Sequence, residues 1–147
     1  MRRAQRFARA AARRGEVPVG AVVVLGGHAV AGAGNRTIGD RDPTAHAEVL
    51  ALRRAARRIR NHRLTGATLY VTLEPCLMCC GAAVHARVGR LVFGAPDPKV
   101  GAISSLFRRG GPAGLNHRFD ITGGVGAEES TEVLRGFFRA RRERRSK

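Results

Sequence analysis

Four residues in two short motifs have the types and the spacing for metal-assisted chemistry. His46 and Glu48 stand two residues apart in the first motif. Cys76 and Cys79 stand three residues apart in the second motif, which follows a proline. One imidazole and two thiols make three ligands for a zinc ion, and a zinc site with three protein ligands keeps a position open for water, as catalytic sites do. In such a site His46, Cys76 and Cys79 would bind the metal. Glu48 would be left to act as a general acid and base.

Each motif alone has an ordinary alternative. His-x-Glu often marks only a helix start, and Cys-x-x-Cys also occurs in redox sites and in halves of structural zinc sites. Cys80 leaves a four-ligand structural site open as a further alternative. Neighbouring residues on a helix point about 100° apart, however, so we expect Cys80 to be a small buried residue. A peptidase is disfavoured, because its zinc motif places two histidines at i and i+4.

The spacing also says where the motifs must lie. His46 and Glu48 point to roughly opposite sides of a regular helix, so they can serve one ion only if it lies beyond the helix end. Cys76 and Cys79 share one helix face and can bind the same ion from a first turn. The positive end of the helix dipole favours the thiolate form. The sequence therefore predicts two helix starts that face each other.

Hydrophobic periodicity and turn residues place these helix starts in an α/β chain. Helices are expected over 2–15, from Pro43 or Thr44 to about Arg60, from Pro75 to about His85 and over 127–145. Strands are expected over Val17–Leu25, His28–Gly34, Ala67–Thr72, Arg90–Gly94 and Phe119–Thr122, with one helical turn at about Ser105–Arg108. Periodicity predicts that the last helix faces the core with Val133, Leu134, Phe137 and Phe138, and exposure of one of the two phenylalanines as a base-stacking surface is an alternative. The order predicts a three-layer α/β/α sandwich with a mixed five-stranded sheet and helices on both faces.

Length and composition exclude several classes of protein. The 147 residues, of which 44% are hydrophobic, fit one domain over 1–147. No apolar run is long enough to span a bilayer, so we expect no membrane partner. All three cysteines lie within five residues of one another. Cysteines so close together, and odd in number, do not form the disulfide framework of a secreted protein. A reducing cytoplasm is the expected location.

The charge points to an acidic macromolecule as partner. The chain has 27 basic and 11 acidic residues, and its net charge is +16. Arginine stripes of this kind attract polyanions and grip phosphates, although a compositional bias toward arginine is an alternative source for part of them. The stretch 2–15 is basic and amphipathic like a transit peptide, but it lacks serine, and we interpret it as the first helix.

Three longer stretches, Glu16–Val24, Asp42–Glu48 and Tyr70–Cys79, closely resemble the bacterial tRNA-specific adenosine deaminases. The similarity continues through Gly81-Ala82, Val92–Ala95, Asn116–Arg118 and Phe137–Arg139, and covers about residues 4–142 in register. The resemblance implies the cytidine-deaminase-like fold, a homodimer, and the zinc-dependent hydrolytic conversion of the wobble adenosine of an arginine tRNA to inosine.

The resemblance also implies substrate contacts. Asn35 matches a residue that hydrogen-bonds the purine, although Asn is also a common turn residue. Asp97 matches a loop that lines the RNA channel, where a carboxylate can accept from a ribose 2′-hydroxyl. The prolines on either side of Asp97 depart from the family pattern. The basic C-terminal helix, at about 127–145, resembles the part that meets the anticodon stem-loop, which makes Phe138 and Arg139 candidate contacts.

A pocket for a flipped adenine also needs apolar walls, for which Val17, Leu73 and Val71 are candidates. Two competing hypotheses remain open from the sequence. One is a deaminase of free bases or nucleosides on the same fold. The other is a non-enzymatic zinc module that binds RNA, with Cys80 or His85 as a fourth ligand.

Overall fold

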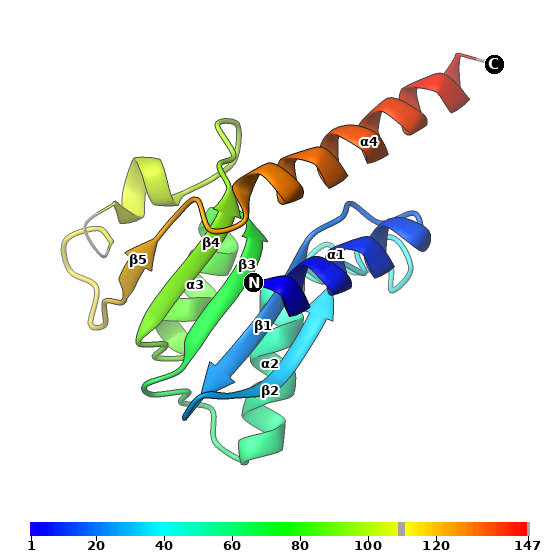
Figure 1. Ribbon diagram of the computed structural model, residues 1–147. Coiled ribbons are helices and arrows are strands. Elements are labelled where there is room, and N and C mark those ends of the chain that lie inside the picture. The colour runs from blue at the N-terminus through cyan, green and yellow to red at the C-terminus, as the bar shows by residue number, and fades with distance from the viewer. Residues whose placement is uncertain (109–110, 147) are drawn as a thin grey trace.

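The computed structural model describes residues 1–108 and 111–146, and it is built around one five-stranded sheet (Figure 1). The strands are β1 (Gly20–Leu25), β2 (His28–Gly34), β3 (Thr68–Leu73), β4 (Arg90–Ala95) and β5 (Asp120–Thr122). Their order across the sheet is β2-β1-β3-β4-β5. β1 runs antiparallel to both β2 and β3, whereas β3, β4 and β5 are parallel. The mixed five-stranded sheet expected from the sequence is therefore confirmed.

Helices cover both faces of this sheet, which gives the expected three layers (Figure 1). α1 (Arg2–Arg13) and α4 (Ala127–Arg145) lie on one face, and α2 (Ala47–Ile59) and α3 (Leu77–His85) lie on the other. None of the helices in the described part of the chain is long and apolar enough to cross a membrane.

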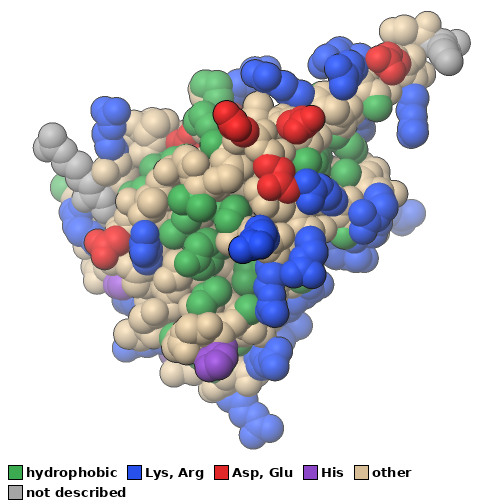
Figure 2. Space-filling view, in the orientation of Figure 1, with side chains coloured by type: hydrophobic (Ala, Val, Ile, Leu, Met, Phe, Trp, Pro, Cys, Tyr) green, Lys and Arg blue, Asp and Glu red, His purple; other side chains and the backbone are tan. Residues whose placement is uncertain are grey.

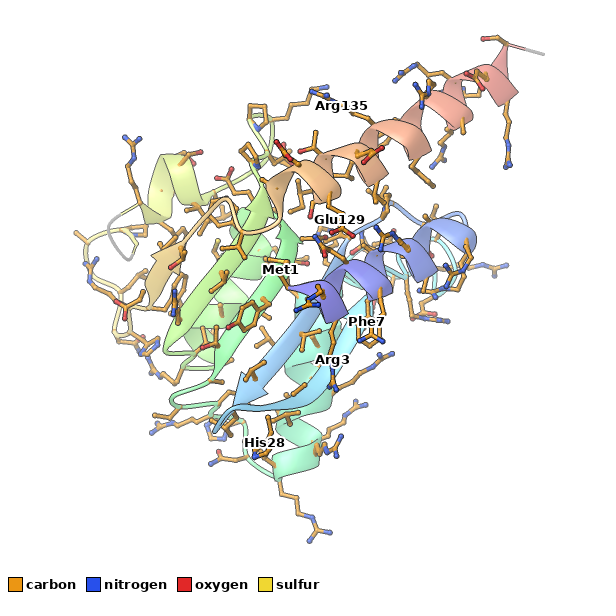
Figure 3. The ribbon with its side chains drawn as sticks, viewed as in Figure 1. Met1, Arg3, Phe7, His28, Glu129 and Arg135 are labelled. Atoms are coloured by element: carbon orange, nitrogen blue, oxygen red, sulfur yellow. The ribbon has the colours of Figure 1, made fainter. Side chains whose placement is uncertain are left out.

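Close packing of α1 on the sheet depends on glycine. A Cβ atom added at Gly20 of β1 would lie 1.9 Å from the carbonyl oxygen of Ala4. The ring of Phe7 lies over Gly32 of β2, where an added Cβ would lie 2.3 Å from the ring (Figure 3). Arg9 of α1 also pairs with Glu129 of α4, which joins the two helices on this face (Figure 3).

The core lies between the sheet and α2 and α3, and it contains side chains of β3 and β4. Leu69 and Val71 of β3 and Leu91 of β4 are fully buried. Ala47, Ala51 and Ala55 supply the buried stripe of α2, at the spacing that a helix needs to press one face on a sheet. Buried apolar contacts with the sheet, more than intrinsic helix propensity, therefore hold α2 and α3 in place, and with them the N-terminal ends that carry the two motifs.

Several of the expected elements begin later than the sequence predicts, and the shift is largest for α2 and β1. α2 starts at Ala47 and not at Pro43 or Thr44, because Asp42 Oδ1 accepts hydrogen bonds from the N–H and the hydroxyl of Thr44 and closes a turn there. β1 starts at Gly20 and not at Val17, because Val19 N–H bonds the Val17 carbonyl in a tight turn.

The expected helical turn at Ser105–Arg108 is a short π-helix at Ile103–Phe107, slightly earlier in the chain. Its Phe107 is buried and stacks on Phe119 with ring centroids 6.0 Å apart. This stacking anchors the segment to the chain just before β5.

The expectation that α4 turns its apolar side chains into the core is wrong for Phe138. That side chain is 41% exposed, and Ser130 is the one residue of α4 classed as buried among those described. The reason is that α4 meets the sheet through its first turns and then projects beyond it (Figure 1). Residues 127–145 do form a helix with an apolar face, but part of that face lines a cavity and does not pack on the sheet.

Candidate active site

The two motifs meet at the facing starts of α2 and α3. His46 is the N-cap residue of α2, and Cys76 is the N-cap residue of α3. Both have extended backbone, with ψ of 149° and 172°, so their side chains can turn beyond the helix ends. His46 Nδ1 lies 3.7 Å from Cys76 Sγ and 3.5 Å from Cys79 Sγ. Residues that stand 30 and more positions apart in the chain therefore form one cluster.

This cluster fits a zinc ion. Its three ligand atoms all lie within 4.8 Å of one another, and no other such group of three occurs in the described part of the chain. Zinc bonds of about 2.0–2.1 Å to nitrogen and 2.3 Å to sulfur, at a tetrahedral angle, give nitrogen–sulfur separations of about 3.6 Å. The distances from His46 Nδ1 to the two sulfur atoms agree with that value. One imidazole and two thiols are also donors that zinc prefers.

The Cys76 thiol is activated for metal binding. The hydrogen bond from the Cys79 thiol, helped by one from His46, lowers the pKa of Cys76 to about 4. The same hydrogen bond raises the pKa of the Cys79 thiol, because Cys79 keeps the shared proton. A cation that enters such a cluster displaces that proton, so we expect metal binding to release protons.

Cys80 stands outside the cluster. Its side chain is fully buried, and its thiol points to the Pro75 carbonyl at 3.8 Å. Burial raises the pKa of Cys80 to about 12, which keeps it a neutral thiol. These features agree with the expected small buried residue, and they leave the cluster with three protein ligands.

Glu48 lies beside the cluster, in the first turn of α2. Only 4% of the residue is exposed, and its Oε2 has no hydrogen-bond partner among the described residues. Burial raises the pKa of this carboxyl above its usual value. A buried carboxylate oxygen without a partner is costly, unless a ligand or water completes it. The position and the raised pKa suit a group that takes up and releases a proton.

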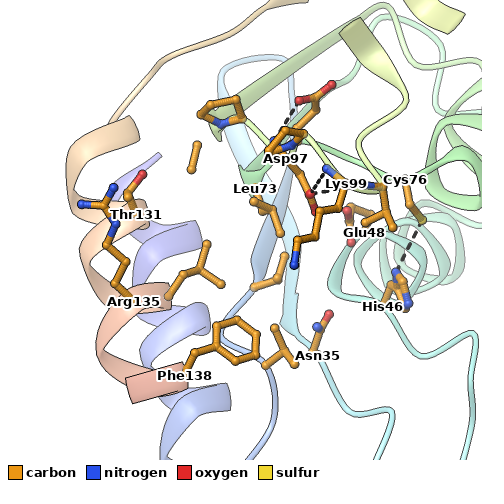
Figure 4. Close-up of a pocket in the computed structure, with 18 of the residues that line it drawn as sticks. Asn35, His46, Glu48, Leu73, Cys76, Asp97, Lys99, Thr131, Arg135 and Phe138 are labelled. Carbon is orange, nitrogen blue, oxygen red and sulfur yellow. Dashed lines mark hydrogen bonds between the residues drawn. The ribbon is translucent and has the colours of Figure 1, made fainter. Parts of the chain in front are cut away.

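The cluster opens into a cavity of about 990 Å³. One wall is the turn before β1 and the loop after β2, and a second is the loop from Pro96 to Val100. A third wall is one face of α4 (Figure 4). The lining includes eight of the residues that the sequence singled out, namely Val17, Asn35, His46, Glu48, Leu73, Cys76, Asp97 and Phe138. Phe138 points from α4 across the cavity toward Asn35 (Figure 4).

Two candidate residues lie elsewhere. Val71 is fully buried in the core and does not line the cavity. Arg139 is exposed, but it is not part of the lining. The helix turns by about 100° per residue, so a position directly after Phe138 faces another way.

Sequence reasoning missed several lining residues. They are Val19, Thr37, Glu74, Lys99, Val100, Thr131, Leu134, Arg135 and Arg142, together with residues of the Ala95–Pro98 stretch other than Asp97. Those on α4 recur at steps of three and four, as one helix face requires. Extending that spacing from Phe138 would have identified them. Basic side chains also gather over α1 and over the outer part of α4 (Figure 2).

Asn35 has both a structural contact and a free donor. Its Oδ1 accepts a 2.8 Å hydrogen bond from the N–H of Ala47, the first residue of α2. Its Nδ2 makes no hydrogen bond to a described residue, and the side chain lines the cavity. Asp97 Oδ1, in turn, accepts from the N–H groups of Lys99 and Val100, which closes a tight turn at the cavity rim.

Comparison with known proteins agrees with this arrangement. The profile of the MafB19-like deaminases matches residues 1–142. A tRNA-specific adenosine deaminase of Haemophilus influenzae is 51% identical over 97% of this chain and 83% of its own length. One of Agrobacterium fabrum is 49% identical over 92% of this chain and 89% of its own length. A solved structure from work on A-to-I editing by tRNA:A34 deaminases is 47% identical, with a TM-score of 0.85 over 89% of this chain and 95% of that chain.

These similarities extend over nearly the whole chain, whereas the zinc signature alone is shared by deaminases of many bases. By sequence and by fold, the chain belongs to the bacterial tRNA-specific adenosine deaminases, within the MafB19-like deaminase family.

Proposed function

We propose that this chain is a zinc-dependent enzyme that converts adenosine to inosine at the wobble position of a tRNA anticodon, by hydrolysis with release of ammonia. The observation that carries the proposal is the unpartnered, buried Oε2 of Glu48 beside a three-ligand cluster that opens into a cavity. The activity named for its relatives supports the choice of substrate.

In this proposal His46, Cys76 and Cys79 hold the zinc ion. A zinc ion in a three-ligand site supplies a water nucleophile at neutral pH, because it lowers the pKa of its water to about 7. Glu48 Oε2 would take one proton from the attacking water and pass it to a ring nitrogen of adenine. As the carbonyl of inosine forms, the same carboxylate would take the second proton of that oxygen and pass it to the amine, which departs as ammonia. Its burial supports this role, since a carboxyl with a raised pKa can hold the proton between the two transfers.

The walls of the cavity suit a purine that has been turned out of its stack. Val17 and Leu73 offer apolar surface, and the ring of Phe138 offers a face for stacking. The free Nδ2 of Asn35 can donate to an acceptor nitrogen of the purine. The carboxylate of Asp97 at the rim can accept from a ribose hydroxyl.

The basic face of α4 suits the RNA around that base. Arg135 and Arg142 line the cavity, and Arg139 lies on the same helix between them. The net charge of +16 favours a polyanionic substrate over a free nucleoside. We therefore propose the anticodon stem-loop as the bound element, and an arginine tRNA as its source, following the family resemblance.

Three further features belong to the proposal. Residues 1–147 would form one deaminase domain that ends in the basic helix. Two copies would form a homodimer, as the family resemblance implies. The enzyme would act in the cytoplasm, where reduced thiols and tRNA are both present.

The experiment is incubation of the zinc-loaded protein with a tRNA that carries adenosine at the wobble position. Inosine is scored as guanosine after reverse transcription and sequencing. We expect conversion at that position and none with Glu48→Ala. Turnover of free adenosine or of another free base, with no conversion in tRNA, would replace this proposal by the free-base alternative.

A further inference from the structure

Two buried glutamates outside the proposed chemistry each hold one loop of the cavity wall. Glu16 is 2% exposed and Glu74 is 4% exposed. Neither forms an ion pair with a residue that the structure describes. A buried carboxylate without a cationic partner is costly unless hydrogen bonds satisfy its oxygens. In both residues the donors come from a loop beside the cavity.

Glu16 holds the loop after β2. Its Oε1 accepts from the N–H groups of Gly39 at 2.7 Å and Ile38 at 3.1 Å. Its Oε2 accepts from the hydroxyl of Thr37 at 3.3 Å and again from the Ile38 N–H at 3.2 Å. Thr37 lines the cavity, so these bonds fix part of its wall.

Glu74 holds both ends of the opposite loop. Its Oε2 accepts from the N–H of Asp97 at 2.9 Å. Its Oε1 accepts from the N–H of Ser104 at 2.9 Å and from the Ser104 hydroxyl at 3.0 Å. The loop passes very close to the carboxylate, since a Cβ added at Gly101 would lie 2.5 Å from Glu74 Cδ.

The composition of this loop makes the Asp97 contact its anchor. Pro96 and Pro98 have no N–H to donate, so Asp97 supplies the one donor between them. The next three N–H groups, of Lys99, Val100 and Gly101, all bond to Asp97 itself. These three bonds stay within the turn. At Asp97, the hydrogen bond that connects the turn to another segment is the one from its N–H to Glu74.

The same contacts connect the loop to the metal cluster. Glu74 stands two residues before Cys76, and Cys76 forms an antiparallel bridge with Gly101. The N–H of Ala102 bonds the Pro75 carbonyl at 2.9 Å. The segment that supplies one thiol thus also sets the position of the rim that carries Asp97.

We propose that Glu16 and Glu74 are positioning residues for the substrate, which act through Thr37 and Asp97 by fixing the two loops that shape the cavity. This inference rests on the proposed function. A carboxylate is required because both of its oxygens accept, whereas glutamine turns a donor NH₂ group toward an N–H that needs an acceptor. The two loops are held independently, so each glutamate should control its own.

The test is hydrogen–deuterium exchange of the zinc-loaded parent and of Glu74→Gln and Glu16→Gln. We expect amide exchange to be about tenfold faster over 97–104 in Glu74→Gln, and unchanged over 37–39, because a charge-assisted bond is lost at one loop only. Glu16→Gln should show the reverse pattern. Equal exchange in variant and parent, or faster exchange over both loops in each variant, would overturn the proposal.

Kinetics on an anticodon stem-loop complete the test. Glu74→Gln should lower kcat/KM about tenfold, mainly through KM, with zinc content unchanged. The exposed Glu128→Gln is the matched control and should behave as the parent. A parent without deaminase activity would refute the proposed function itself. An active parent with variants of unchanged KM would refute only the positioning role.

Discussion

Asn35 Oδ1 accepts a 2.8 Å hydrogen bond from the N–H of Ala47, so one side chain both caps α2 and lines the cavity. The capping oxygen belongs to the fold, and the free Nδ2 remains available to a ligand in the cavity that Asn35 lines. The position of His46 depends on the same bond, because His46 immediately precedes Ala47. Structure and proposed recognition therefore use opposite ends of one amide.

Substitutions of Asn35 can separate the capping role of its oxygen from the proposed recognition role of its nitrogen. Asn35→Asp keeps an acceptor for the Ala47 N–H and removes the donor, so thermal stability should change little while kcat/KM falls about tenfold or more. Asn35→Ala removes both groups and should also lower the free energy of unfolding by roughly 1–2 kcal/mol. Thermal unfolding and tRNA deamination kinetics measure the two effects. Equal activity losses without the difference in stability would show that the cap has no separate role.

Replacement of Glu48 should separate metal binding from catalysis. Glu48→Gln keeps the shape of the side chain but cannot carry the proton, so we expect full zinc content and a loss of kcat of about 10²–10⁴-fold. Zinc is measured by atomic emission, and inosine formation by sequencing. Loss of zinc from this variant would mean that Glu48 acts as a ligand, which the cluster geometry does not predict.

Metal removal should expose one reactive thiol and not three. In the chelator-treated protein Cys76 should react with iodoacetamide first, because it is half-buried and its pKa is lowered to about 4. Cys79 and Cys80 are both fully buried and should react only on unfolding. Peptide mass spectrometry assigns the alkylated residues. The variant Cys80→Ala should retain one zinc ion per chain, while Cys76→Ala should lose it. Zinc loss in Cys80→Ala would favour the four-ligand alternative.

The arginines of α4 that line the cavity should contribute to binding through phosphate contacts. Arg135→Ala and Arg142→Ala should each weaken tRNA binding and reduce the slope of log affinity against log salt by about 1, if each contacts one phosphate. Arg57→Ala is a suitable control, because Arg57 is exposed on α2, which covers the other face of the sheet. Fluorescence anisotropy at several salt concentrations measures both quantities, and an equal effect of Arg57→Ala would argue for nonspecific charge.

The packing of α1 predicts a large effect at one glycine. Gly20→Ala places a Cβ against the Ala4 carbonyl, a backbone atom that cannot move alone, and should lower the free energy of unfolding by roughly 1–3 kcal/mol. Gly136→Ala meets nothing within 4 Å in α4 and should stabilise the helix by up to about 1 kcal/mol. Denaturant unfolding distinguishes the two, and a stable Gly20→Ala would show that α1 can slide on the sheet.

The sequence predicted the layers, the mixed sheet and the pairing of the two motifs, because these depend on local periodicity and on residue types with few roles. The facing helix starts were correct, although Pro43 and Thr44 lie in a turn that a side-chain hydrogen bond from Asp42 decides. Such a turn depends on the rotamer of a single side chain, here Asp42, and the periodicity of hydrophobic residues carries no information about that rotamer.

The rest of the site depends on contacts between distant segments. Glu16 and Glu74 look like ordinary surface residues in the sequence, and only the fold brings loops from 21 and more residues away onto their oxygens. Phe138 had two interpretations for a related reason, since periodicity placed it in the core and the family resemblance made it a substrate contact, and the structure places it in the cavity lining. Periodicity shows that a helix has an apolar face, but it does not say whether a sheet or a cavity lies opposite.

The most direct test of the central claim compares three substrates with one enzyme preparation. They are an anticodon stem-loop with adenosine at the wobble position, the same stem-loop with that adenosine moved by one nucleotide, and free adenosine. Release of inosine is followed by mass spectrometry after nuclease digestion. We expect rapid conversion of the first substrate and little or none of the other two. Turnover of free adenosine, with the wobble adenosine untouched, would contradict it.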